Sequence, residues 1–182
     1  MIYSNWHKAD LSEVKQSFDN IHNGLDWGFA DDPTAYIRTH LDNKHKKVYV
    51  FDEFAKSGLH INQIADELKQ RMPDEIVTCD SSEPRSIADL RRHDIKAYGA
   101  KKGAGSIEHG IRWLQGYEII VDERCIETIK ELSSYRWKED KNGNPMPKPE
   151  DKNNHLLDAL RYALESEMTQ SQIKVKTFKG GI

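Results

Sequence analysis

The spacing of apolar residues follows a strand-like period early in the chain and alternates between strand and helix later. Three early segments have the alternation of β-strands. They lie at residues 21–27, 34–41 and 47–54. The second and third are expected to pair as an antiparallel hairpin. Ahead of them, Leu11, Val14 and Phe18 recur at helical spacing, which predicts a helix over residues 9–20.

Beyond the hairpin, helical and strand-like patterns alternate. Helices are predicted at residues 61–72, 83–92, 107–114, 123–132 and 154–165. Strands are predicted between them at residues 75–79, 94–98 and 117–121. Three antiparallel strands followed by alternating helices and strands predict an α/β fold, in which a mixed sheet is flanked by helices. This order resembles the ribonuclease H-like arrangement.

Two segments lie outside the alternation. Residues 134–150 are rich in Lys, Asn, Pro and Gly, and the turn signal Lys-Asn-Gly-Asn at 141–144 predicts a protruding hairpin or loop. Residues 167–182 have no clear pattern and are expected to form a C-terminal tail. A single domain is therefore expected over residues 1–182, with its core at about 20–166.

Composition narrows the class of protein. The chain has no apolar run of membrane-spanning length and no apolar N-terminal signal segment, so a cytosolic protein is expected. A net charge of −3 argues against a globally basic nucleic-acid binder. Nucleic-acid binding is not excluded, because basic residues can be concentrated locally, as they are from Arg91 to Lys102. The simpler interpretation of that stretch is a solvated helix end and loop. Cys79 and Cys125 have neither a disulfide framework nor a zinc-binding spacing.

Three aspartates lie at the edges of different apolar elements. Asp26 ends the first strand-like segment, Asp80 follows the strand at 75–79, and Asp158 lies within the helix at 154–165. Each alone has a simpler interpretation, as a turn residue, a helix cap or a salt-bridge partner. Acids at strand ends and on a helix facing the sheet can converge, and converging carboxylates repel one another unless cations hold them. The three together predict a divalent metal site.

Other acids and a histidine are secondary candidates for that site. His155 shares a helix face with Asp158, and it could ligate a metal, move protons or cap the helix. Asp32 could fold back past a turn toward the metal, although its position before Pro33 fits a turn residue somewhat better. Glu53, on the third strand, could lie behind the metal ligands.

A basic, glycine-containing loop is the candidate for nucleic-acid binding. Lys101 and Lys102 precede a predicted helix, and Gly103 and Gly105 let the backbone approach a phosphate. The hairpin at 134–150 adds further lysines. The chain contains no Gly-x-x-x-x-Gly-Lys-Ser/Thr motif, so no ATPase is expected from it.

Four stretches, in order along the chain, resemble the C-terminal nuclease domain of tailed-phage terminase large subunits. They are residues 24–35, 79–87, 101–107 and 154–163. The resemblance implies a ribonuclease H-like fold and a metal-dependent endonuclease that cuts concatemeric viral DNA, with catalysis at Asp26, Asp80 and Asp158. His155 matches a histidine found beside the last acid in part of that family. Because such subunits carry an ATPase motor that this chain lacks, an excised nuclease domain or a prophage remnant is expected.

The resemblance also implies cofactors and partners. The three aspartates would hold Mg²⁺ or Mn²⁺, expected as two ions about 3.5–4 Å apart, one activating a water and one stabilising the leaving oxygen. Double-stranded DNA is the implied substrate. The terminase small subunit and the portal are implied partners in the full-length protein, and the host cytoplasm is the expected location.

Two other interpretations remain open at the level of sequence. A junction resolvase or transposase-type nuclease of the same fold would use similar acids, and a preference for branched DNA would indicate it. A docking module for packaging proteins would keep the acids without activity. Stable partner capture without metal binding would indicate that module.

Overall fold

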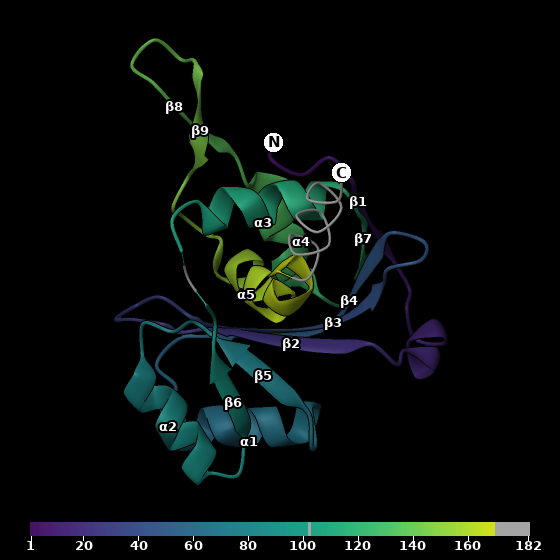
Figure 1. Ribbon diagram of the computed structural model, residues 1–182, viewed down its shortest axis with the longest axis vertical. Helices are drawn as coiled ribbons and strands as arrows, with labels where there is room; N and C mark the ends of the chain where they lie inside the picture. Colours follow the sequence, from purple (N-terminus) through teal and green to yellow (C-terminus); the bar gives the residue numbers. More distant parts are fainter. Residues whose placement is uncertain (102, 170–182) are drawn as a thin grey trace, which may run out of the picture.

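A seven-stranded mixed sheet separates two layers of helices in the computed structural model, which describes residues 1–101 and 103–169 (Figure 1). Its strands are β1 (Trp6–Ala9), β2 (Ile21–Asp26), β3 (Thr34–Asp42), β4 (Lys47–Lys56), β5 (Ile76–Cys79), β6 (Lys96–Gly99) and β7 (Glu118–Asp122). The helices are the 3-10 turn η1 (Val14–Ser17) and α1 (Ile61–Arg71), α2 (Pro84–Arg92), α3 (Ser106–Gln115), α4 (Ile126–Ser134) and α5 (His155–Ala163). A separate hairpin consists of β8 (Trp137–Glu139) and β9 (Pro145–Pro149).

The strand order is β1-β7-β4-β3-β2-β5-β6. Strands β2, β3 and β4 form the antiparallel meander, and β5 and β6 extend it in parallel beyond β2. On the other side, β7 and then β1 add in parallel to β4. The predicted fold class, an α/β mixed sheet with helices on its faces, is therefore confirmed.

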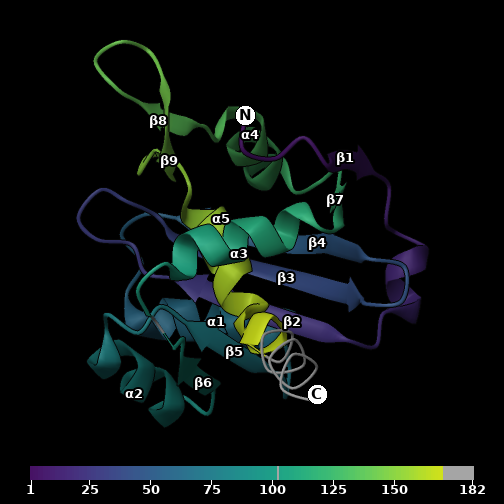
Figure 2. The same cartoon turned by 45° about the horizontal axis from the view of Figure 1, so that its top comes forward.

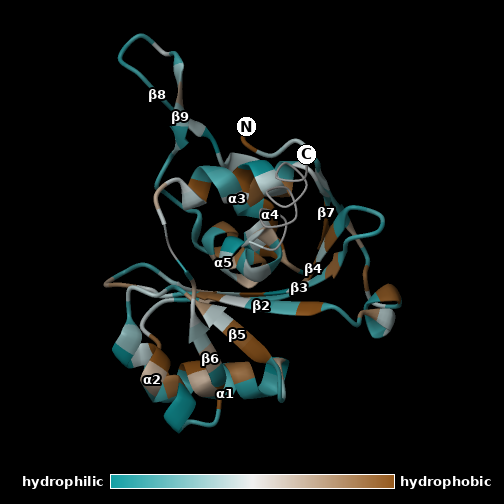
Figure 3. Ribbon diagram, in the orientation of Figure 1, coloured by the Kyte–Doolittle hydropathy of each residue, from teal (hydrophilic) through white to brown (hydrophobic). Residues whose placement is uncertain are grey.

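The alternation within β3 gives the sheet two buried faces. Ala35 and Ile37 contribute to the core beneath α3, α4 and α5, whereas Tyr36 packs into the core with α1 and α2. The ring of Phe54 on β4 lies 5.3 Å from that of Tyr36. Helix α1 completes this second core through the buried face that its apolar stripe predicts. Figure 3 shows hydrophobic residues along β5 and on part of each helix that covers the sheet.

The predicted helix over residues 9–20 is wrong. The segment contains the end of strand β1, a turn and the short η1, because tertiary contacts override the helical spacing. The Leu11 N–H donates to the Asp122 carboxylate, and Phe18 stacks on the ring of His40. Val14, the middle residue of the apparent stripe, is exposed. Strand β1 itself was not predicted from the sequence.

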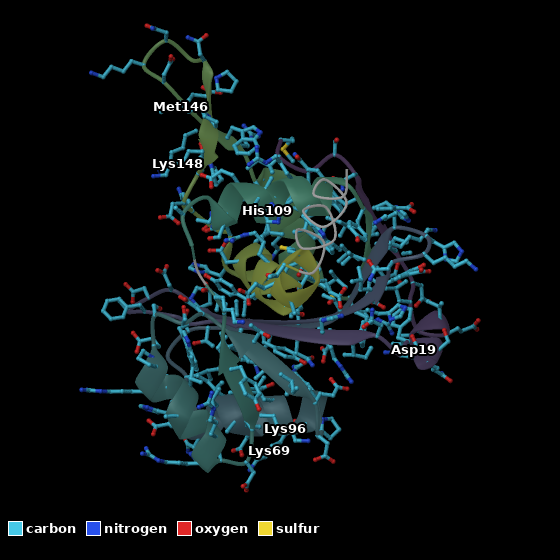
Figure 4. The ribbon with its side chains drawn as sticks, in the orientation of Figure 1. Asp19, Lys69, Lys96, His109, Met146 and Lys148 are labelled. Carbon is cyan, nitrogen blue, oxygen red and sulfur yellow. The ribbon has the colours of Figure 1, made fainter. Side chains whose placement is uncertain are left out.

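The hairpin predicted at 134–150 is confirmed as β8 and β9, which project from the body of the molecule (Figure 2). Gly143 takes a positive φ of 81° in its turn, and the Asp140 carboxylate accepts backbone N–H groups from Asn142 and Asn144. Met146 and Lys148 lie on this hairpin (Figure 4).

The expected tail begins as helix. Residues 165–169 are helical, and Met168 is buried against the main core. The remainder of that prediction, residues 170–182, lies outside the described residues. Within residues 1–101 and 103–169, no helix is long and apolar enough to cross a membrane.

Candidate active site

The carboxyl ends of β2 and β5 place two of the predicted aspartates side by side on the sheet edge. The parallel register pairs Leu25 with Cys79, so Asp26 and Asp80 follow at corresponding positions. The backbone N–H of Asp80 donates to the Leu25 carbonyl at 2.9 Å. The Trp27 indole N–H donates to the Asp80 carbonyl at 2.8 Å. These two hydrogen bonds fix the spacing between the two strand ends.

Helix α5 lies directly on β2 because Gly24 has no side chain. A Cβ at Gly24 would lie 1.9 Å from the carbonyl oxygen of Ala159 and 2.9 Å from the amide nitrogen of Ala163. The backbone of β2 therefore passes directly against the backbone of α5 at Gly24. This contact sets α5 against the sheet, with His155 and Asp158 beside the end of β2.

The loop after β2 folds back toward the same place. The Gly28 N–H donates to the Thr34 hydroxyl at 3.1 Å, and a Cβ at Gly28 would lie 2.4 Å from the Asp32 carbonyl oxygen. His155 connects the loop to the strand end. Its Nδ1 lies 3.1 Å from Asp26 Oδ2, and its Nε2 lies 3.6 Å from Asp32 Oδ1. The structure therefore places both secondary candidates, His155 and Asp32, near Asp26.

Burial and the nearby negative charges disfavour the ionised form of Asp26 and Asp158. Burial raises the pKa of Asp26, the charges of Asp158 and Asp80 raise it further, and the His155 hydrogen bond opposes them. Burial likewise raises the pKa of Asp158, against the opposing charge of Arg161. The pKa of His155 is raised by its hydrogen bond to Asp26. Carboxylates in this state are suited to ligation by a cation.

The Asp80 carboxylate also stabilises the turn that follows β5. Its carboxylate accepts the Ser82 backbone N–H at 3.1 Å and the Ser82 hydroxyl at 2.8 Å. Within the described part of the chain, no group of three or more His, Cys, Asp or Glu side chains is already arranged to hold a metal ion.

The predicted DNA-binding loop lies beside α5. The exposed Lys101 donates its backbone N–H to Glu165 at 2.7 Å. A cavity of about 230 Å³ opens there between the loop and α5, lined in part by Arg161 and Tyr162. Lys102 lies outside the described residues, so its prediction has no structural counterpart.

A second cavity, of about 610 Å³, lies elsewhere, between η1 and strands β3 and β4. Its charged groups are already engaged: Arg38 pairs with Glu75, and Asp52 pairs with Arg71. Although larger, this cavity is lined by none of the three candidate aspartates, and Glu53 is the one secondary candidate that reaches it.

Two buried charged residues that support α5 were missed by sequence reasoning. Glu131 of α4 accepts the backbone N–H groups of Leu156 and Leu157 at 3.2 and 3.0 Å and so caps the start of α5. Arg161 donates to the Asp158 carboxylate. Acids and arginines on helices ordinarily face solvent, so the sequence carries no signal for either role.

Glu53, which the sequence suggested as an acid behind the metal ligands, is engaged elsewhere. Its carboxylate accepts the backbone N–H groups of Glu127 and Thr128 at 2.8 and 2.9 Å, together with the Thr128 hydroxyl. It therefore caps α4, the helix that carries Glu131.

The buried carboxyl of Glu131 is expected to make stability depend on pH. Burial raises its pKa to about 7, so the folded chain binds this proton more tightly than the unfolded chain does. Its contribution to the free energy of unfolding is therefore full below about pH 4.5 and lost as pH rises to about 7. Relative to wild type, Glu131→Gln should gain roughly 2–3 kcal/mol over that range.

The measurement is urea unfolding in EDTA at several pH values, with Glu127→Gln as the matched control for replacing an acid on α4. Glu127 is exposed on the same helix. A difference between Glu131→Gln and wild type that stays constant from pH 4.5 to 7.5 would contradict the raised pKa.

Comparison with known proteins identifies the family. A model of the terminase RNase H-like domain matches residues 26–166. The large terminase subunit of Bacillus phage SPP1 is 40% identical over 163 residues, which are 87% of this chain and 39% of that protein. The terminase large subunit of Escherichia phage T5 is 31% identical over 88% of this chain and 39% of its own length. The chain thus spans about two fifths of these relatives.

A solved structure gives the same result. The nuclease domain of the SPP1 large terminase, crystallised with bound Mn, superposes with a TM-score of 0.85 and 37% identity, over 91% of this chain and 98% of that domain. The similarity therefore covers the sheet, both helical layers and the elements that carry the aspartates. The chain belongs to the terminase RNase H-like domain family.

Proposed function

We propose that this protein is a metal-dependent DNA endonuclease that cuts concatemeric viral DNA during genome packaging. The proposal is supported by the proximity of Asp80 and Asp158 to Asp26, whose carboxyl senses both of their charges, in a chain of this family. The Mn bound to the related SPP1 domain supports a divalent ion as the cofactor.

The donor set fits hard divalent cations. Asp26, Asp80 and Asp158 supply carboxylate oxygens and His155 a ring nitrogen, which suits Mg²⁺ or Mn²⁺ rather than a thiolate-preferring metal. Burial, and to a smaller extent repulsion from Asp158 and Asp80, raises the pKa of Asp26, and a bound cation relieves that repulsion. When bound, a pair of such ions polarises a phosphodiester and lowers the pKa of a water beside it.

Side chains of the protein orient the site and bind the DNA for this reaction. Asp26 holds His155 through Nδ1, so the imidazole is oriented and its raised pKa favours a held proton until a metal competes for the site. Lys101, Lys102 and the lysines of the β8–β9 hairpin (Lys138, Lys141 and Lys148) contact the DNA backbone. Contacts of this kind carry little sequence information, so the cut-site preference is weak.

In the full-length context, the small terminase subunit and the portal are the partners, and the reaction takes place in the host cytoplasm. The motor domain of a large terminase would add phosphate contacts that a nuclease domain alone lacks. Binding of DNA by this chain is therefore weak and strongly dependent on salt.

The proposal is tested by cleavage of supercoiled plasmid in Mn²⁺, Mg²⁺, Ca²⁺ or EDTA. Nicking and linearisation are expected with Mn²⁺ or Mg²⁺ and none in EDTA, because the bound cation is what activates the attacking water. A folded protein that cuts under none of these conditions would contradict the proposal. Faster cutting of four-way junctions than of linear duplex would instead indicate a resolvase.

A further inference from the structure

Arg161 lies two turns into α5, next to the candidate metal ligand Asp158, and is almost completely buried. The residue is 7% exposed, and its Nη2 lies 2.5 Å from Asp158 Oδ1. The opposing helix confines it, since a Cβ at Gly110 of α3 would lie 3.0 Å from the Arg161 Cδ. The side chain is therefore held between α3 and Asp158.

A second donor reaches the same carboxylate oxygen. Asn154, at the start of α5, donates its side-chain amide to Asp158 Oδ1 at 3.2 Å. No donor from residues 1–101 or 103–169 reaches Oδ2. The two oxygens of this carboxylate thus have different environments: Oδ1 accepts two protein donors, whereas Oδ2 accepts none from those residues.

We propose that Arg161 is the positioning residue for Asp158: it holds Oδ1, so that Asp158 presents only Oδ2 to a divalent ion. This inference rests on the proposed metal site. Partners that hydrogen-bond to a metal-ligating carboxylate fix its orientation and tune the metal. Asp158 is accordingly a one-oxygen ligand, and Arg161 stays bound when the ion arrives.

An alternative is that Arg161 only neutralises Asp158 until a metal ion displaces it. The burial of Arg161 argues against this alternative. Separating the pair would leave a guanidinium without a partner in a confined site, which is strongly unfavourable. Arg161 borders the cavity beside Lys101, but only 8% of its side chain is exposed, so its guanidinium would have to leave a confined position to separate from Asp158. Arg161 also offsets one of the converging negative charges before any metal binds.

The test is isothermal titration of Mn²⁺ into metal-free protein, without DNA. Arg161→Gln is expected to raise the Kd for Mn²⁺ about 10- to 100-fold, the usual effect of losing a partner of a metal ligand. Arg161→Lys, which keeps the charge and one donor, should recover part of this loss. Arg112→Gln, an exposed arginine of α3, is the control for removing one positive charge.

A double-mutant cycle tests whether Arg161 acts through Asp158. In an Asp158→Asn background, Arg161→Gln should change the Kd for Mn²⁺ by less than about twofold, because the contact is already altered. An equal effect in both backgrounds would overturn the proposal. Tighter Mn²⁺ binding by Arg161→Gln would also overturn it, because it would make Arg161 a competing counter-charge.

Other outcomes are also decisive. If Arg161→Gln does not fold, Arg161→Lys and Gly110→Ala carry the test, since a Cβ at Gly110 shifts the Arg161 side chain without removing its charge. Unchanged Mn²⁺ affinity in both would overturn the proposal. A wild-type protein that binds no Mn²⁺ would overturn the metal site as well, whereas wild-type binding that is insensitive to Arg161 would overturn this inference alone.

Discussion

Asp26→Asn is expected to abolish DNA cleavage, with a loss of about 1,000-fold or more, because a ligand lost from the metal matters more than an outer partner. Asparagine preserves the size of the side chain and its ability to hydrogen-bond to His155, but removes the charge that attracts the cation. The measurement is the single-turnover rate of plasmid nicking in Mn²⁺.

Stability distinguishes a metal ligand from a turn residue at this position. Burial and the charges of Asp158 and Asp80 raise the pKa of Asp26, so its carboxylate is less favourable in the folded chain than in the unfolded one. Asp26→Asn should therefore unfold at a urea concentration no lower than that of wild type in EDTA.

Asp31→Asn is the matched control, since Asp31 is an exposed acid of the following loop. It should cut plasmid at close to the wild-type rate. Full cleavage by Asp26→Asn would remove Asp26 from the site. Lower stability with residual cleavage would assign it a structural role.

Gly24→Ala is expected to destabilise the protein by about 3 kcal/mol or more, because the added methyl group meets backbone that cannot rotate away. The Cβ would lie 1.9 Å from the Ala159 carbonyl oxygen, so α5 has to move off β2. That displacement would carry Asp158 away from Asp26, so cleavage should fall together with stability. Thermal unfolding should show a midpoint lower by on the order of 10 °C.

Gly103→Ala is the control for replacing a glycine by alanine. A Cβ at Gly103 meets nothing within 4 Å, so its unfolding midpoint should stay close to that of wild type. An unchanged midpoint for Gly24→Ala would mean that α5 and β2 are not in the close contact described here.

The sheet could be predicted from the sequence because its strands contribute apolar residues to the cores on both of its faces, which gives them a recognisable strand pattern. The sequence also predicted where the candidate acids lie in the fold, since Asp26 ends β2, Asp80 follows the parallel strand β5, and Asp158 lies on the helix that packs on β2. The roles of these acids stay predictions, because contact geometry does not reveal ligation. The loop lysines likewise stay predictions.

What the sequence could not reveal are pairings between distant elements. Glu131 and Arg161 look like ordinary surface charges until α4 and α3 pack against α5. The error over residues 9–20 has a similar origin, because the partners of Leu11 and Phe18 lie on β7 and β3. Local periodicity carries no information about such contacts.

The position of α5 in the chain has a consequence for biosynthesis. This helix follows all seven strands of the sheet in sequence, yet it covers β2 and β3 near the middle of that sheet. A nascent chain released from the ribosome only as far as β7 therefore has Asp26 and Asp80 but an uncovered apolar sheet face and no third acid. Emergence of α5 completes the core and adds the third candidate acid in one event, so the proposed cutting activity would arise only with the folded domain.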